Sequence, residues 1–272
     1  MARRRRKKQG TVFSSVIVLV AIAWGIFTKA GSDPSGSQFL KDFTGNHDEH
    51  VTNTIGDATK ANKAYGGLSD ADYKKLANLN FKNGGKAFTE VNHNQSTLVK
   101  NSWKVNRVIY SNLDSLNRTS RPNTAFLEKR NVADDSLRVR QFVEPTGWHY
   151  NRRNGTQIYN RGHLIAYSVS AGIDQSGNYD PRNQSGDQNN PKNLFTQSAF
   201  SNQKIQTIFE AKVRKALRQN KRVIYQATAI FRGNELMARG VNLQAVSTDG
   251  TLNFNVYLYN VQPGYEFNYN NG

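Results

Sequence analysis

The feature that most constrains this chain is a short run at residues 159–165, where an arginine, a glycine and a histidine precede an apolar segment. Arg161 and His163 are separated by a single glycine, and Tyr159 is expected near the end of a strand that delivers both of them. Three more polar residues follow along the chain: Asn193, Asn202 and Glu210. Side chains of these types are an unusual set for a structural core, so we examined which chemistry they fit.

The residue types fit phosphodiester hydrolysis. That reaction needs a base, a cation that offsets charge on the phosphorane, and protonation or metal coordination of the leaving oxygen. Histidine can be the base because its ordinary pKa lies near neutral pH, and arginine offers a bidentate fork to phosphate oxygens. Mg2+ keeps most of its waters, so asparagine and glutamate oxygens suffice to hold it. An isolated Arg-Gly-His tripeptide is nevertheless common by chance.

The spacing of the downstream residues predicts that Asn202 and Glu210 share one side of a helix. Eight residues are just over two helical turns, which puts the two side chains about 80° apart. Two structural interpretations stay open, with Asn202 as the helix N-cap and Glu210 paired with Arg214. The amphipathic helix itself is predicted over residues 203–219 by apolar residues at helical intervals: Ile205, Ile208, Phe209, Val213, Ala216 and Leu217.

Residues with period-two alternation predict strands on both sides of this helix. Ser69, followed by acidic residues, predicts a short capped helix upstream. Together these elements predict the α+β class, with a central, largely antiparallel sheet flanked by helices. The predicted strands cover residues 87–91, 104–110, 222–231, 241–246 and 252–261.

These motifs resemble those of the DNA/RNA non-specific endonucleases, a family with the ββα-metal fold and an Asp-Arg-Gly-His motif. Within it, the chain is most similar to membrane-attached DNA-entry nucleases of Gram-positive bacteria. The resemblance covers about residues 80–272, and Asn160 stands where the family has its aspartate. Asn160 removes a carboxylate beside the histidine and is expected to keep a hydrogen-bonding role. The supporting segments are residues 110–114, 145–148, 189–197, 212–217 and 254–256.

The resemblance implies a role for each site residue. His163 would be the general base, Arg161 would bind phosphate, and Asn193 would stabilise the site or contact the substrate. Asn202 would bind the metal directly, and Glu210 would hold it through a water molecule. The implied cofactor is Mg2+, with Mn2+ as a substitute.

The charge of the chain predicts an anionic polymer as partner. The net charge is +17, and the first 30 residues hold seven of these excess charges, which leaves a basic remainder. The resemblance implies double-stranded and single-stranded DNA, and RNA, as substrates cut with low sequence specificity. It also implies that Lys129 and Arg130 contact the substrate, although as surface charges they need no explanation.

The N-terminus predicts membrane attachment. Six basic residues at positions 3–8 precede an uncharged, largely apolar stretch at 11–27. This stretch is a little short for a spanning helix of roughly 20 residues, and it also fits a signal peptide whose cleavage would release a secreted enzyme. We favour an uncleaved signal anchor with the remainder outside the cell. The chain then divides into an anchor (1–30), a polar tether (31–80) and a nuclease domain (81–272), with the DNA-uptake machinery as a further expected partner.

Two other functions stay open. A surface receptor that binds DNA without cutting it is favoured by the loss of the aspartate at Asn160, and it predicts no nicking at any divalent-ion concentration. A phosphodiesterase acting on lipids or small molecules would hydrolyse small diesters without preferring polymers. The sequence does not choose among DNA uptake, nutrition and defence as the cellular role.

Overall fold

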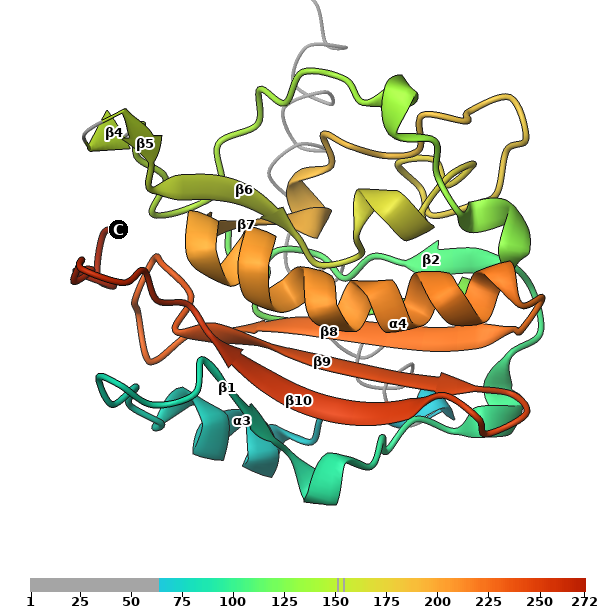
Figure 1. The fold of residues 1–272 in the computed structure, drawn as a ribbon, viewed down its shortest axis with the longest axis horizontal. Coiled ribbons are helices and arrows are strands. Elements are labelled where there is room, and N and C mark those ends of the chain that lie inside the picture. The colour runs from blue at the N-terminus through green and yellow to red at the C-terminus, as the bar shows by residue number, and fades with distance from the viewer. Residues whose placement is uncertain (1–63, 151, 154) are drawn as a thin grey trace, which may run out of the picture. The chain divides into compact units, whose positions relative to one another are not determined.

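The computed structural model describes residues 64–272 apart from Asn151 and Asn154. Six strands form one sheet in the order β1-β10-β9-β8-β3-β2, and every neighbouring pair is antiparallel (Figure 1). The predicted α+β class with a largely antiparallel sheet is confirmed. The strands are β1 (Phe88–Glu90), β2 (Arg107–Ile109), β3 (Asn123–Leu127), β8 (Val223–Ile230), β9 (Gly240–Ser247) and β10 (Asn253–Tyr259).

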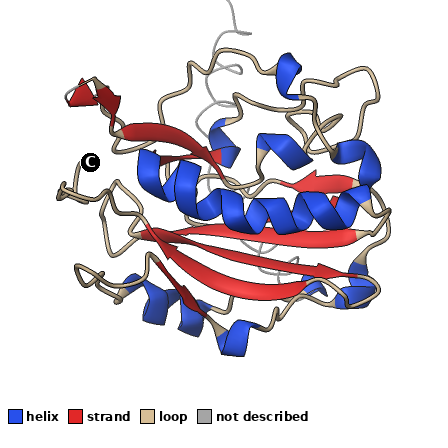
Figure 2. Ribbon diagram, in the orientation of Figure 1, coloured by secondary structure: helices blue, strands red, loops and turns tan. Residues whose placement is uncertain are grey.

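Helix α4 (Thr207–Arg218) lies along one face of this sheet (Figure 2). Its residues Phe209, Val213 and Leu217 follow one another at four-residue intervals and are buried in the main hydrophobic core. This confirms the predicted amphipathic helix. Ile208 is an exception, because it lies beside the buried stripe and its side chain is 47% exposed.

Helix α3 (Asp70–Ala77) covers the opposite face. Successive residues of a strand point to opposite faces of a sheet, and Ile230 and Tyr257 accordingly pack against Leu76 and Ala77 rather than against α4. The predicted cap is confirmed, since the backbone N–H of Asp72 donates to the Ser69 hydroxyl at 3.1 Å. These residues fall within the range assigned to the polar tether, so this part of it belongs to the folded core.

A separate two-stranded ribbon carries the histidine motif. It pairs β6 (Tyr159–His163) with β7 (Leu194–Ser198), and the short hairpin of β4 (Arg152–Arg153) and β5 (Thr156–Gln157) precedes it. The strand begins at Tyr159 instead of ending there, so Arg161 and His163 lie within it. A π-helical turn (Ser201–Gln206) follows β7 and continues into α4, which separates β6 from the large sheet in Figure 1.

The predicted anchor, and the tether up to residue 63, lie outside the described residues. Within residues 64–272, apart from the two omitted positions, every helix falls short of the length and hydrophobicity that crossing a bilayer requires. The domain boundaries therefore stay predictions.

Because α3 packs against the sheet, a substitution in this helix should lower the stability of the protein, although the helix lies in the range predicted as a tether. Leu76 is 5% exposed, so Leu76→Ala should lower the free energy of unfolding by about 2 kcal/mol through the lost apolar contact. Leu137, which is 40% exposed, is the matched control, and Leu137→Ala should change stability by less than about 0.5 kcal/mol. Urea unfolding of the three proteins measures this, and equal effects of the two substitutions would place α3 outside the core.

Candidate active site

One pocket of about 490 Å³ brings together most of the predicted site residues. Strand β6 contributes Asn160, Arg161 and His163, and the π-helical turn with α4 contributes Asn202 and Glu210. Strand β6, which pairs with β7, and the following helix thus line the pocket, in the ββα arrangement that the resemblance implied. The other lining residues include Arg138, Gln141, Gln157, Tyr167, Ser168 and Gln206.

His163 is the last residue of strand β6, and its ring contacts Gln188 and Gln141. Its Nε2 lies 3.2 Å from the backbone oxygen of Gln188, and the amide nitrogen of Gln141 lies 3.4 Å from the same oxygen. The Gln188 carbonyl only accepts and so pairs with a proton on Nε2, whereas the Gln141 amide nitrogen, 3.2 Å from the same Nε2, donates to it when Nε2 is unprotonated. Burial lowers the pKa of His163 to about 4, the Gln188 hydrogen bond opposes this shift, and nearby Arg138 adds to it. The imidazole is therefore neutral at pH 7, as a general base must be.

Arg161 is fixed at the pocket wall by three contacts. Its Nε donates to the backbone oxygen of Val143, its guanidinium lies 4.2 Å from the centre of the Trp148 ring, and Glu144 is 3.8 Å away. The Arg161 side chain is 18% exposed, so part of the guanidinium still reaches the pocket. Trp148 therefore orders the arginine before any substrate arrives.

Asn202 lies in the π-helical turn, and this corrects the N-cap interpretation. The helical segment already begins at Ser201, with Phe200 in the cap position and no side-chain cap hydrogen bond. Because Asn202 is inside the helix, its side chain is not used as a cap, and it lines the pocket instead. Single π-helical turns of this kind are frequent at functional sites.

Glu210 is held by a hydrogen bond on one side and an ion pair on the other. The Gln206 amide donates to Glu210 Oε1 and to the backbone oxygen of His163, both at 2.9 Å. Arg214 lies 3.6 Å from the other carboxylate oxygen, so the expected pair with Glu210 is present alongside the pocket role. Burial raises the pKa of Glu210, whereas Gln206 and Arg214 favour the charged form.

Gly162 is required by close packing against the partner strand. A Cβ at this position would lie 2.3 Å from the side-chain oxygen of Gln197. Gln197 in turn donates to the Gln206 side chain at 2.9 Å and to the Ser201 hydroxyl at 3.0 Å. The glycine of the motif therefore makes room for a buried amide of the protein.

Asn193 does not line the pocket but binds the backbone of Ile165, two residues after His163. Its side chain is fully buried, its Oδ1 accepts from the N–H of Ile165 at 2.8 Å, and its Nδ2 donates to the Ile165 carbonyl at 3.0 Å. It therefore fixes the chain where it leaves the histidine. Of the two predicted roles, this placement favours stabilisation over substrate contact.

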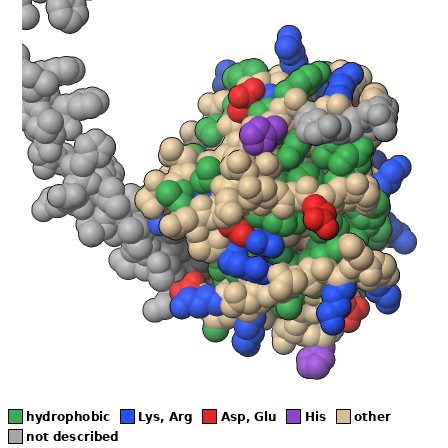
Figure 3. All heavy atoms as spheres, turned by 90° about the vertical axis from the view of Figure 1, so that its left-hand side faces the viewer, with side chains coloured by type: hydrophobic (Ala, Val, Ile, Leu, Met, Phe, Trp, Pro, Cys, Tyr) green, Lys and Arg blue, Asp and Glu red, His purple; other side chains and the backbone are tan. Residues whose placement is uncertain are grey.

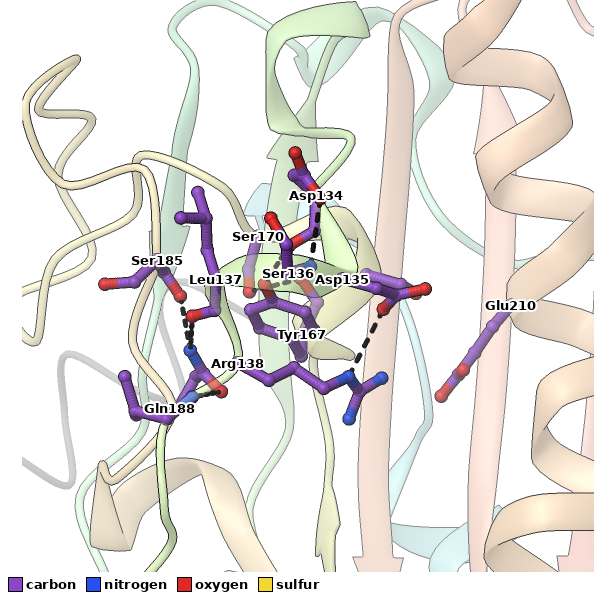
Figure 4. A network of polar contacts seen from close by, with 12 residues as sticks. Asp134, Asp135, Ser136, Leu137, Arg138, Tyr167, Ser170, Ser185, Gln188 and Glu210 are labelled. Carbon is purple, nitrogen blue, oxygen red and sulfur yellow. Dashed lines mark hydrogen bonds and ion pairs between the residues drawn. The ribbon is translucent and has the colours of Figure 1, made fainter.

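The predicted basic contacts lie away from the pocket, and a different arginine lines it. Lys129 and Arg130 begin a short 3-10 turn, and the guanidinium of Arg130 lies 4.0 Å from the centre of the Tyr179 ring. Arg138 lines the pocket and points toward Glu210 in Figure 4, with its guanidinium 4.7 Å from the centre of the Tyr167 ring. The sequence offered only a run of basic residues near the motif, without a signal for which one enters the site.

The donor atoms of the pocket suit a hard divalent cation. Amide oxygens are available at Asn160 and Asn202, and Glu210 supplies one carboxylate. Within the described part of the chain, no group of three His, Cys, Asp or Glu side chains could hold a metal. An ion here would depend on amide oxygens and retained waters, which Mg2+ accepts readily.

The fold and this pocket together define a phosphodiester hydrolase of the ββα-metal class, and the comparisons agree. Residues 96–249 match the family model for DNA/RNA non-specific endonuclease. The crystal structure of NucA from Streptococcus agalactiae with magnesium bound is 30% identical, with 74% of this chain and 94% of that chain covered and a TM-score of 0.58. The form of NucA without metal is 31% identical over the same shares, with a TM-score of 0.57. The chain belongs to the DNA/RNA non-specific endonuclease family and is an endonuclease.

The environment of His163 predicts an unusual titration. Its ring protons, followed by NMR in the metal-free protein and assigned by their loss in His163→Gln, should titrate near pH 4. In the unfolded state His163 takes up its proton near pH 6.5. The contribution of His163 to the free energy of unfolding is therefore complete above pH 6.5 and falls as the pH drops toward 4. A midpoint at or above 6.5 would show that the ring is not desolvated.

The neutral residue at position 160 predicts a change in metal affinity. Asn160→Asp adds a carboxylate to the pocket and should tighten Mg2+ binding about tenfold through added Coulomb attraction. Asn101→Asp, at an exposed position outside the pocket, is the matched control and should leave affinity unchanged. Titration calorimetry measures both, and equal affinities in the two variants would remove position 160 from the ion's surroundings.

Proposed function

We propose that this endonuclease depends on a divalent metal, with Mg2+ as the physiological ion, and cuts DNA and RNA with little sequence preference. The observation that carries the proposal is the pocket that unites His163, Arg161, Asn202 and Glu210. Support for Mg2+ comes from its oxygen donors and from the magnesium ion bound in the NucA structure. Mn2+, with similar ligand preferences, is the expected substitute.

His163 would act as the general base. Its unprotonated ring nitrogen takes a proton from water, and the water oxygen bonds to phosphorus as the bond from phosphorus to the 3′ oxygen breaks. Arg161 binds a non-bridging oxygen and offsets the charge that develops there. Because Trp148 and Val143 already hold Arg161, the guanidinium needs little reorganisation when substrate binds.

The metal would be held by Asn202 directly and by Glu210 through water, with Asn160 close enough to contribute a hydrogen bond. When bound, the ion supplies Lewis-acid stabilisation of the phosphorane and of the leaving oxygen. The chain's own contribution is to keep Glu210 oriented through Gln206. Arg138 provides a second cation at the pocket, and its stacking on Tyr167 limits its motion.

The proposed location is the outer surface of the cell membrane. It rests on the basic cluster and apolar stretch of the first 30 residues and on the absence of cysteine from the whole chain. An anchored nuclease with a basic body would meet extracellular nucleic acid near the membrane, which is compatible with a partner in DNA uptake. Fractionation of cells expressing the full chain or a chain lacking residues 1–30 tests this, and recovery of the full chain in the medium, with the shortened chain kept inside the cell, would favour a cleaved signal peptide.

The deciding experiment is cleavage of supercoiled plasmid with Mg2+, with Mn2+ or with chelator. The unmodified protein should cut only with metal, and His163→Ala should lose about 10²- to 10⁴-fold in kcat, as for a lost general base, while still binding DNA in a gel-shift assay. His93→Ala, at an exposed turn outside the pocket, is the matched control. Binding without cutting by all three proteins would support the surface receptor. Hydrolysis of small diesters without preference for polymers would support the second alternative.

A further inference from the structure

The loop at residues 137–143 forms a rim of the pocket, and two amide side chains fix its backbone. Gln188 accepts from the N–H of Val139 at 3.0 Å and donates to the carbonyl of Leu137 at 3.1 Å. Figure 4 shows the second of these bonds. Asn189 makes the same two kinds of contact with the carbonyl of residue 140 at 3.1 Å and the N–H of residue 142 at 3.0 Å. The rim is therefore built to hold a fixed conformation.

Side chains of this rim divide between the pocket and solvent. Arg138 and Gln141 line the pocket, and the Gln141 amide nitrogen lies 3.2 Å from Nε2 of His163. Phe142, the next residue, is 71% exposed, and Val139 is 50% exposed. Two exposed apolar side chains therefore lie on the same short loop as two residues that line the pocket.

The charges around this rim favour an anionic partner. Residues 137–153 contain four arginines and a single acidic residue, Glu144, and Asp135 just before this range pairs with Arg138 at 3.2 Å. Tyr150, a second aromatic on this stretch, is 74% exposed, with the guanidinium of Arg152 at 5.9 Å from its ring centre. Figure 3 shows the face of the molecule on the side of the β4–β5 hairpin, where hydrophobic side chains gather with Lys and Arg side chains around them. Aromatic rings among basic side chains are typical of surfaces that bind unpaired nucleic acid.

We propose that Phe142 is a stacking platform for an unpaired base next to the phosphate that is cut. The proposal rests on the active site described above, because Phe142 directly follows Gln141, which lines that pocket. The bases of a duplex are stacked on each other and cannot reach this ring, whereas a single strand can turn one base onto it. The enzyme therefore prefers single-stranded or locally unpaired substrate. Stacking accepts every base, so this preference adds no sequence specificity.

A lipid surface is the main competing occupant, since an exposed phenylalanine among arginines also suits a membrane interface. Nucleic acid is favoured because the rim is continuous with the pocket. Arg138 and Gln141 belong to the same short loop and line the site from which the strand would emerge.

The test compares two single-stranded oligonucleotides, one with normal bases and one with stable abasic (tetrahydrofuran) nucleotides on both sides of the cut phosphate. Full-length Phe142→Ala should lose about tenfold in kcat/KM on the first, the size of one base–aromatic stack, and less than about twofold on the second. Phe142→Trp should restore cleavage. Tyr265→Ala, which removes a half-exposed aromatic outside the pocket, should match the unmodified protein on both substrates.

Equal losses on both oligonucleotides, or no loss on either, would overturn the proposal. Unchanged cleavage together with loss of binding to phosphatidylglycerol vesicles by Phe142→Ala would also overturn it, in favour of the lipid surface. A strand containing 2-aminopurine separates this question from catalysis. Its fluorescence should be quenched on binding to the unmodified protein and not to Phe142→Ala, whether or not the strand is cut.

Discussion

The site depends on one buried amide, that of Gln206. This residue is 1% exposed, its nitrogen donates to Glu210 and to the backbone of His163, and its oxygen accepts from Gln197. Both N–H donors and the oxygen are therefore engaged, as a buried amide requires. Because these three partners come from β6, β7 and α4, one side chain sets the distance between the strand that carries His163 and the helix that carries Glu210.

Several neighbouring features follow from this amide. Gln197 must pass close to the opposite strand to reach it, and only glycine at position 162 leaves the space. The π-helical turn ends at Gln206 itself, so the irregular turn carries both this amide and Asn202 into the site. A regular α-helix over the same residues would rotate these side chains differently relative to Glu210. Gly162 and the π-helical turn therefore both serve to bring Gln197 and Gln206 into contact.

The sequence predicted the parts of this molecule whose signal is local. Alternation predicted five of the six strands of the large sheet and missed β3, and the apolar stripe predicted α4, because burial imposes a period on each of these elements. The motif also identified His163, Asn202 and Glu210, which do share a pocket. The resemblance to the family supplied the pairing between these distant segments, and the chemistry of the residues agreed with it.

The errors have a common physical origin in contacts between distant segments. Asparagine is a residue type that often caps a helix, but Asn202 lies inside a π-helical turn. Such a turn leaves no periodic signal in the sequence. Arg138 enters the pocket because Gln188 ties down the loop on either side of it, a contact across about fifty residues that no local pattern reveals. Helix α3 lies in the range predicted as a tether, whose sequence is polar, and its Leu76 is buried against the sheet.

The charge balance of the pocket links the metal to the substrate. Its described lining has one carboxylate, Glu210, against the guanidinium groups of Arg138 and Arg161, and burial keeps His163 neutral. Such a lining attracts phosphate more strongly than it attracts a cation. A second carboxylate at position 160 would cancel the remaining positive charge of the lining, because it would attract the ion and repel the phosphate. With asparagine there, the negative charge that balances a divalent ion has to come largely from the substrate, so metal and nucleic acid should bind to this site cooperatively.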